Sequence, residues 1–293
     1  MPQPRASEYE NYSFVDCPRS VFAIVGNIDV DAVRYDFDAR VQRLGQEQTV
    51  HFVDQVKNRI SAFIENTGKK PKHIVVYRDG VSDTEFKKVI HEELESIRQA
   101  CTAFDINLKT MPDVVPGEAP ESNLDEVGPP NSATFTYIVT QKRHHARFFV
   151  LEDGEKKIKD TNLLPGTIIE DIVVSNDFFD FYIASHEGTT GTSRPTHYYV
   201  LQNTWKVSTS FWQSVIYCHC YLYARTTKSI SLPAPLMYAH LAAKKCKLQF
   251  DYFRTCPPQE YITSTDDIVR MDMEQKAVTN HEGLIKMRSM TFC

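Results

Sequence analysis

The sequence predicts an α/β fold, in which helices pack on a mixed sheet. Short apolar runs rich in β-branched residues recur along the chain and indicate buried strands. Between them, apolar residues fall at steps of three and four, which is typical of helices. The chain has 293 residues, of which 42% are hydrophobic and 24% are charged, so one large domain or two small ones can form around an ordinary core.

The N-terminal part predicts a loose lead-in followed by two strands of a hairpin. Residues 1–19 are polar and contain several prolines, which favours an irregular segment. Residues 20–28 (SVFAIVGNI) form a short apolar run and predict a buried strand. Residues 33–43, which carry Tyr35 and Phe37, predict the second strand of the hairpin.

A helix, a strand and a second helix are predicted next. The first helix follows from apolar residues on one helical face, namely Val50, Val53, Val56, Ile60 and Phe63. Residues 66–68 (NTG) end it, and residues 72–77 (KHIVVY) predict a compact buried strand. Ser82 with Glu85 three positions later fits a capping box. The helix that it opens carries Phe86, Val89, Ile90, Leu94 and Ile97 on one face.

Residues 111–133 interrupt this pattern. They hold five prolines and five acidic residues but no lysine or arginine, which predicts a surface insertion or a disordered loop. We expect residues 20–293 to form one domain around this insertion.

The second half predicts further strands and two closing helices. The strands are expected at residues 134–141, 147–151, 167–174, 180–185 and 197–201. The helices are expected at residues 210–224 and 234–246. Residues 251–275 are mixed and polar and predict a loop, and residues 282–290 predict a last short helix.

Charge, cysteines and hydropathy narrow the classes of function. The net charge is −5, so any contact with nucleic acid must come from a local cluster of cations in a groove. The seven cysteines show no paired spacing, which predicts reduced thiols in an intracellular protein. The sequence has no apolar run near the ~20 residues that a membrane span needs and no apolar core of a secretory signal at its start, so we expect no membrane partner.

Three residues are candidates for chemistry, and each also has an ordinary structural interpretation. Asp79 follows the buried strand at 72–77, where ligands and catalytic groups gather in α/β sheets, but it could equally cap the next helix or shape the turn with Gly80. Glu47 precedes the first helix, where a carboxylate is also favoured by the helix dipole. His240 falls within a predicted helix, where histidine is more often packed than catalytic.

A dense cationic run follows the strand at 134–141. Its members are Lys142, Arg143, His144, His145 and Arg147. The run lies between two predicted strands and therefore at an end of the sheet, which favours binding of an anion such as phosphate over a merely solvated edge. Further cations follow at His186, Arg194, Arg225, Lys228, Lys244, Lys245 and Lys247.

In order along residues 20–247, the chain resembles the Piwi domains of eukaryotic Argonautes, which are small-RNA-guided silencing proteins. The resemblance rests on VFAIVGNID, RVQRLGQE, KPKHIVVYRDGVSDTEFKKVIHEELESIRQAC, TYIVTQKRHHARFF, LLPGTIIE, FDFYIASHEGTTGTSRPTHYYVL and YARTTKSISLPAPLMYAHLAAK. Single motifs such as YRDG are weak, whereas the ordered set is specific. The resemblance implies an RNase H-like mixed sheet flanked by helices.

The resemblance also implies a metal-dependent endoribonuclease site. Cutting members of the family use Asp, Glu, Asp and His around two divalent metals, Mg²⁺ or Mn²⁺, which activate water and steady the leaving oxygen. The second Asp matches Asp79, the Glu matches Glu47 and the His matches His240. Asp79 and His240 would then be metal ligands, and Glu47 would position a water.

One departure from the family concerns the first Asp. In the family it lies on a strand that reads roughly G-x-D-V-T-H-P, and this sequence contains no such segment. The chain is therefore expected to be N-terminally truncated and to lack the family's first strand, which would leave an unpaired interior edge. We expect metal binding to be weak and the chain to be unable to cleave on its own.

Other matched positions contact guide or target RNA in the family. They are Lys142, Arg143, His145, His186, Arg194, Arg225, Lys228, Ser231 and Lys245. Lys245 stands where the family usually has Arg, so the charge is kept and the bidentate fork is lost.

Several functional hypotheses stay open at this point. The first is an RNA-binding Piwi module that uses a small guide RNA and a complementary target RNA. The others are a slicer whose N-terminal half is missing from this sequence, a non-enzymatic module that binds tryptophan-rich silencing proteins, and an unrelated nuclease of the RNase H class. The resemblance places the protein inside the cell, in the cytoplasm, the nucleus or both.

Overall fold

The computed structural model describes residues 19–44, 51–109, 131–150, 162–175, 178–188, 191–205, 207–264 and 266–279. The chain divides into two compact units. One comprises residues 1–67 with residues 238–293, and the other comprises residues 68–237. The predicted lead-in at residues 1–19 except for Arg19, most of the insertion at 111–133 and the predicted helix at 282–290 lie outside the described residues.

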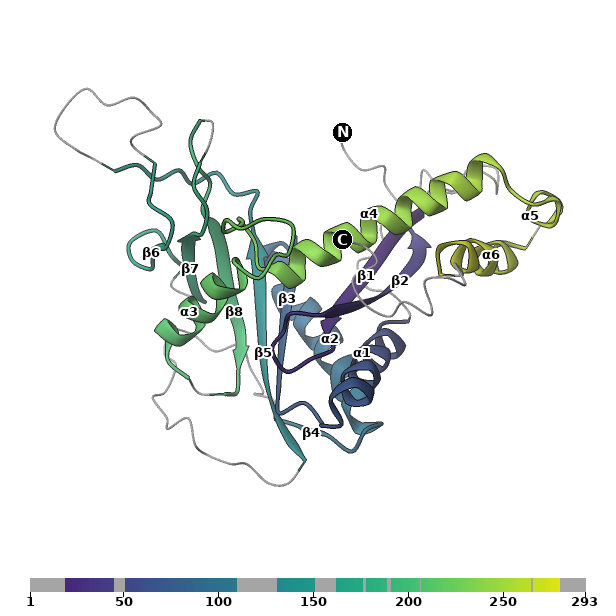
Figure 1. The fold of residues 1–293 in the computed structure, drawn as a ribbon, viewed down its shortest axis with the longest axis horizontal. Coiled ribbons are helices and arrows are strands. Elements are labelled where there is room, and N and C mark those ends of the chain that lie inside the picture. Colours follow the sequence, from purple (N-terminus) through teal and green to yellow (C-terminus); the bar gives the residue numbers. More distant parts are fainter. Residues whose placement is uncertain are drawn as a thin grey trace. The chain divides into compact units, whose positions relative to one another are not determined.

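The unit of residues 68–237 is built on a mixed six-stranded sheet (Figure 1). The order along the sheet is β3-β5-β8-β7-β6, and β4 pairs with β5 as well. The strands are β3 (His73–Asp79), β4 (Asn107–Leu108), β5 (Ser132–Gln141), β6 (Thr167–Ile169), β7 (Phe179–Ala184) and β8 (Thr196–Asn203). The pairs β3–β5 and β4–β5 are parallel and the others are antiparallel, which confirms the predicted mixed sheet.

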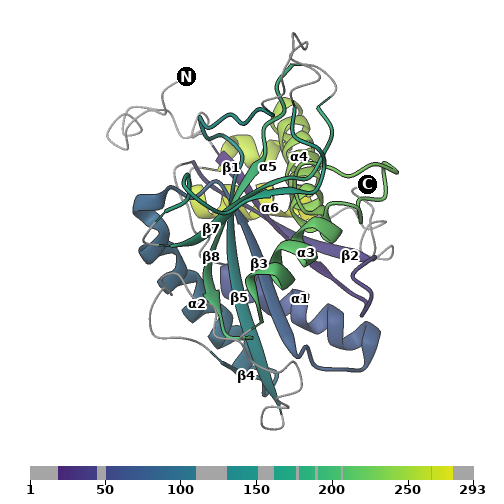
Figure 2. The ribbon, with the colours of Figure 1, turned by 90° about the vertical axis from the view of Figure 1, so that its left-hand side faces the viewer.

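Two helices cover opposite faces of this sheet. Helix α3 (Thr209–His219) buries Trp212 in a core cluster with Tyr198 of β8. Helix α2 (Phe86–Thr102) buries Phe86, whose ring meets the ring of Tyr199 at 4.9 Å. Because successive side chains of a strand point to opposite faces, Tyr198 and Tyr199 place α3 and α2 on either side of the sheet, as Figure 2 shows.

Four local predictions for this unit are wrong or too long, and the first is the helix expected at residues 210–224, which ends at His219 as α3. Ser82 makes no side-chain cap bond, and a 3₁₀ turn (Asp83–Glu85) precedes α2 in place of the predicted capping box. Residues 147–150 form no strand, although their burial alternates as in one. The strand expected at residues 167–174 is the short edge strand β6, since the chain bends from residue 171 onward.

The other unit contains the predicted hairpin. Strands β1 (Arg19–Asn27) and β2 (Tyr35–Arg43) pair antiparallel along their full length. Helix α1 (Phe52–Thr67) ends as predicted, where Gly68 adopts a φ of +66°. Helix α4 (Ala234–Thr255) is longer than expected, and its residues from Tyr238 onward belong to this unit.

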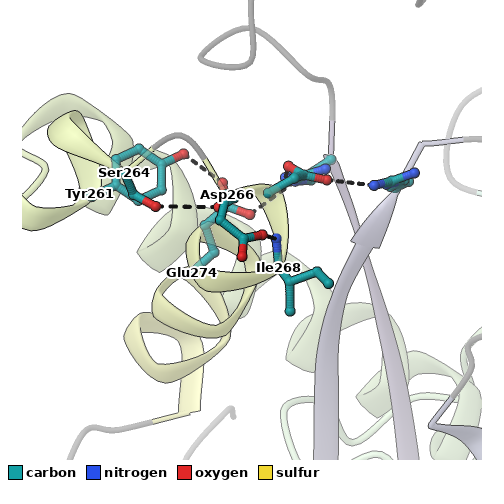
Figure 3. Close-up of polar contacts among 8 residues, drawn as sticks. Tyr261, Ser264, Asp266, Ile268 and Glu274 are labelled. Carbon is teal, nitrogen blue, oxygen red and sulfur yellow. Dashed lines mark hydrogen bonds and ion pairs between the residues drawn. The ribbon is translucent and has the colours of Figure 1, made fainter.

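The predicted loop at residues 251–275 is wrong, because α4 continues to Thr255 and two more helices follow. They are α5 (Gln259–Thr263) and α6 (Asp267–Thr279). The carboxylate of Asp266 accepts a hydrogen bond of 2.8 Å from the backbone N–H of Ile268 and so caps the start of α6 (Figure 3).

A buried ionic network fastens α6 to the hairpin. The guanidinium of Arg19 donates to Glu274 at 2.9 Å and to Asp267 at 2.5 Å, and the Arg19 side chain is 2% exposed. Tyr261 donates to the other oxygen of Glu274 at 2.7 Å, and Figure 3 shows the two side chains pointing toward each other. The carboxylates of α6 therefore neutralise an arginine that would otherwise be buried without a counter-charge.

Strand β3 stands at one end of the sheet order. Among the described residues it pairs with β5 alone. None of the helices among the described residues has the length and apolar character needed to cross a membrane.

Candidate nucleic-acid site

Asp79 lies at the carboxyl end of β3. Its register partner on β5 is Thr140, whose hydroxyl lies 3.5 Å from the Asp79 carboxylate. The next residue, Gly80, has a φ of +76°, which suits glycine, and its N–H bonds the Thr140 carbonyl at 3.4 Å. This left-handed turn ends the strand and leaves Asp79 half-buried at the sheet end.

Lys142 lies at the same end of the sheet, two positions beyond Thr140. Its ammonium group donates a hydrogen bond to the hydroxyl of Ser231. Burial lowers the pKa of Lys142, the nearby charge of Arg194 lowers it further, and the Asp79 carboxylate acts in the opposite direction. The charges of both Arg194 and the candidate catalytic residue Asp79 therefore act on the Lys142 ammonium group.

The segment that carries Ser231 is held against the ends of β7 and β8. The hydroxyl of Thr196 donates to the Ser231 carbonyl at 2.5 Å. The hydroxyl of Ser185 donates to the carbonyl of Ile230 at 2.8 Å. These two bonds fix the position from which the Ser231 hydroxyl meets Lys142.

Arg194 and His186 complete this cluster. Arg194 donates to the backbone carbonyl of Lys142 at 3.4 Å. Burial lowers the pKa of His186, and the charge of Lys142 lowers it further, so His186 lies within electrostatic reach of the lysine. The structure thus brings together five residues that sequence analysis had selected from separate segments, namely Asp79, Lys142, His186, Arg194 and Ser231.

Four other predicted RNA-binding residues belong to the same unit but face the solvent. They are Arg143, His145, Arg225 and Lys228. Lys228 lies 3.9 Å from Glu187 in an exposed ion pair, which contributes little to stability. Their exposure leaves these cations accessible to a large anion.

The remaining predicted residues cannot be joined to this cluster. Glu47 lies outside the described residues. His240 and Lys245 are on α4 in the unit that contains the hairpin, where His240 is exposed and Lys245 is half-buried. Their grouping with Asp79 stays a prediction.

The predicted metal site is incomplete in the described part of the chain. No group of three or more His, Cys, Asp or Glu side chains there could hold a metal ion. Of the three predicted catalytic residues, Asp79 is the one carboxylate among the described residues, and its oxygens are of the type that Mg²⁺ prefers. No metal-dependent step follows from these residues.

Sequence reasoning missed the residues that position the cluster. The hydroxyl of Thr140 meets the Asp79 carboxylate, and the hydroxyls of Ser185 and Thr196 hold the backbone at Ile230 and Ser231. Serine and threonine are common in strands and loops, so a single sequence carries no signal that distinguishes these three from the others.

Comparisons with known proteins agree with this architecture. A sequence profile described as "Piwi domain" matches residues 15–250. Piwi-like protein ergo-1 of Caenorhabditis elegans is 39% identical over 239 residues, which cover 80% of this chain and 19% of that protein. Protein argonaute 7 of Arabidopsis thaliana is 36% identical over 242 residues, which cover 82% of this chain and 21% of that protein. The chain thus spans about a fifth of the length of these relatives.

Solved structures show the same fold. The C-terminal lobe of a budding yeast Argonaute matches with a TM-score of 0.67 and 22% identity, covering 89% of this chain and 53% of that one. Kluyveromyces polysporus Argonaute with a guide RNA matches with a TM-score of 0.64 and 25% identity, covering 80% of this chain and 27% of that one. The mixed sheet with flanking helices is therefore RNase H-like, and the chain belongs to the Piwi domain family of Argonaute-like proteins.

Proposed function

We propose that this chain is the RNA-binding Piwi module of a small-RNA-guided silencing protein. The observation that carries the proposal is the cluster of Lys142, His186, Arg194 and Ser231 beside Asp79 at one end of the sheet. Phosphate groups are bound by such cations and hydroxyls. A local cluster of this kind can attract a phosphate although the whole chain has a net charge of −5. The solved structure of Kluyveromyces polysporus Argonaute, which contains a guide RNA, supports the assignment of RNA as the ligand.

The binding site would extend from the half-buried cluster onto the exposed basic residues. Lys142 and Arg194 would meet phosphates at the base of the site, and Arg143, His145, Arg225 and Lys228 would meet them at its rim. Lys245, on α4, would add a further cation in the complete site. In this proposal the small guide RNA and its complementary target are held through their backbones, so binding depends little on base sequence.

Cleavage is a separate part of the proposal. Asp79, Glu47 and His240 would form the catalytic set, with Asp79 and His240 binding Mg²⁺ or Mn²⁺ weakly. Because the 293-residue sequence contains no segment that matches the family's first Asp, we propose that this polypeptide does not cut RNA on its own. Tryptophan-rich silencing partners and a cytoplasmic or nuclear location are likewise predictions from the resemblance.

Fluorescence anisotropy with single-stranded RNA at several salt concentrations tests the binding proposal. The double variant Arg143→Ala/Arg194→Ala should bind more weakly, and its log–log salt slope should fall by about 1.4, which is twice the ~0.7 expected per lost phosphate contact. Lys87→Ala/Lys88→Ala, on the exposed face of α2, is the matched control for lost charge. Equal affinities and slopes for the wild type and Arg143→Ala/Arg194→Ala would show that the RNA-binding residues are assigned wrongly.

A further inference from the structure

Residues 143–150 run on from β5 with an alternating pattern of exposure. Arg143, His145, Arg147 and Phe149 are exposed, and the residues between them are half-buried. Such a period of two is typical of extended chain, in which alternate side chains stand about 6.6 Å apart on one side. In the part of the chain that the structure describes, the segment forms no ladder with another strand. Its outer side therefore presents two arginines, a histidine and an aromatic ring to the solvent in one row.

The inner side of this segment is anchored. The Nε2–H group of His144 donates to the carbonyl of Pro195 at 2.6 Å, which fixes the tautomer because a carbonyl can only accept. The rings of His144 and Phe148 both meet the ring of Tyr182 edge-on at 5.1 Å. These contacts hold the row in place before any ligand arrives, which reduces the entropy cost of binding.

Arg147 reinforces the backbone of the segment. Its Nη1 donates to the carbonyl of His144 at 3.2 Å and to that of Ala146 at 2.7 Å. These local bonds use part of its donor capacity inside the segment. Phe149 follows two positions later on the same outer side.

Phe149 presents about half of its surface to the solvent. Its side chain is 51% exposed, and it is the one phenylalanine among the described residues that ranks as exposed. No other aromatic ring of the described residues packs on it. An aromatic face left in water beside cations is the arrangement with which proteins stack the bases of single-stranded nucleic acids.

We propose that Phe149 is a base-stacking platform for single-stranded RNA, at the end of a row whose cations hold the backbone. The inference rests on the proposed RNA-binding function and adds a contact to the bases. A base offers its flat face to the ring, while phosphates of neighbouring nucleotides along the strand reach His145 and Arg143, which stand about 13 and about 20 Å from Phe149 at 6.6 Å per alternate residue. Stacking of this kind tolerates any base, so it raises affinity without selecting sequence.

Two 12-nucleotide probes of equal length test this proposal, one of oligouridine and one whose residues are abasic. In anisotropy titrations, Phe149→Leu keeps an apolar side chain and removes the ring. It should weaken oligouridine binding about fivefold or more and leave binding of the abasic probe unchanged. Tyr252→Leu, which removes an aromatic side chain that is 75% exposed on α4, is the control and should change neither.

The outcomes separate the two proposals. If Phe149→Leu changes neither titration, or weakens both equally, the stacking inference falls while the RNA-binding function stands on the Arg143→Ala/Arg194→Ala result. If the wild-type protein binds neither probe, both proposals fall. If a poly-glutamate peptide displaces oligouridine from the wild type but not from Phe149→Leu, the row is a peptide-binding site and the inference is wrong.

Discussion

The ammonium group of Lys142 donates a hydrogen bond to the hydroxyl of Ser231, which lies 89 positions later in the chain. The bond joins the end of β5 to the segment that precedes α4. The backbone of that segment is held by Ser185 and Thr196, near the ends of β7 and β8. A cation next to the Asp79 carboxylate is therefore positioned by contacts from several strands, so the site depends on the packing of the whole sheet.

Glu93 of α2 is expected to stabilise the strand that carries Asp79. One of its oxygens accepts from Arg78 of β3 at 3.0 Å, and the other accepts from the Tyr137 hydroxyl at 2.7 Å. Glu93→Gln should lower the free energy of unfolding by about 2 to 3 kcal/mol, because it removes the carboxylate that pairs with the half-buried Arg78 guanidinium. Urea denaturation measures this change.

Glu95 on the same helix supplies the control. It pairs with Arg98 at 2.5 Å, but its side chain is 64% exposed. Glu95→Gln should change the unfolding free energy by less than about 0.5 kcal/mol. Equal losses for the two variants would contradict the structural role assigned to Glu93.

Gln275 of α6 is expected to protect the edge of the hairpin. Its side-chain amide accepts from the Val41 N–H at 2.8 Å and donates to the Ala39 carbonyl at 2.9 Å, as one residue of a neighbouring parallel strand would. Gln275→Ala should cost about 1 kcal/mol of unfolding free energy and should promote self-association, because the edge of β2 becomes available for pairing. Denaturation and analytical ultracentrifugation measure the two effects.

The neighbouring Lys276, whose ion pair with Asp272 is exposed, provides the comparison. Lys276→Ala should leave both the stability and the monomer content near those of the wild type. If self-association increases equally in Gln275→Ala and Lys276→Ala, the cause is the loss of a polar side chain and not the exposure of the β2 edge.

Asp267 is expected to make stability depend on pH in the acidic range. Burial raises its pKa, but the hydrogen bonds from Arg19 and Arg43 outweigh burial, so the pKa is lowered in the folded state. A carboxyl group with a lowered pKa stabilises the fold fully above its unfolded value of about 3.9, and this contribution is lost as the pH falls through the folded value. The unfolding free energy of the wild type should therefore fall more steeply below pH 4 than that of Asp267→Asn. Parallel curves for the two proteins would contradict this assignment.

The elements that sequence patterns predicted are those with strong local signals. The β1–β2 hairpin, the end of α1 at Gly68 and strand β3 before Asp79 follow from apolar periodicity and turn residues. Helix α6 escaped prediction because polar contacts fasten it to the hairpin, and Arg19 and Glu274 lie 255 positions apart. Residues 147–150 show the alternating burial of a strand but form no ladder among the described residues. Whether a segment pairs with another strand depends on distant parts of the chain, so the local sequence does not reveal it.

Some residues of the candidate site could be predicted from the sequence, and others could not. Lys142, Arg194 and Ser231 were selected through the resemblance, and the structure brings them together. Their supporting hydroxyls at Ser185 and Thr196 carry no sequence signal of their own. The exposed ring of Phe149 was also missed, because a phenylalanine in an apolar run predicts a core position and solvent exposure is visible only after folding.

The cleavage part of the proposal has its own test. Incubation of the 293-residue protein with a guide RNA, a complementary target and Mg²⁺ or Mn²⁺ should give no guided product, because the sequence offers no match to the family's first Asp. Gel analysis of end-labelled target measures the outcome. Cutting at a single site that disappears in Asp79→Ala would overturn this expectation.

The salt dependence of RNA binding by Lys142→Met tests the central claim most directly. Methionine keeps the length and much of the packing of the lysine stem while removing the charge next to Ser231 and Asp79. We expect the wild type to bind single-stranded RNA with a salt-sensitive affinity, and Lys142→Met to bind more weakly with a log–log slope smaller by about 0.7. Lys88→Met on α2 should match the wild type. An unchanged slope in Lys142→Met, or a wild-type protein that does not bind RNA at low salt, would contradict the account.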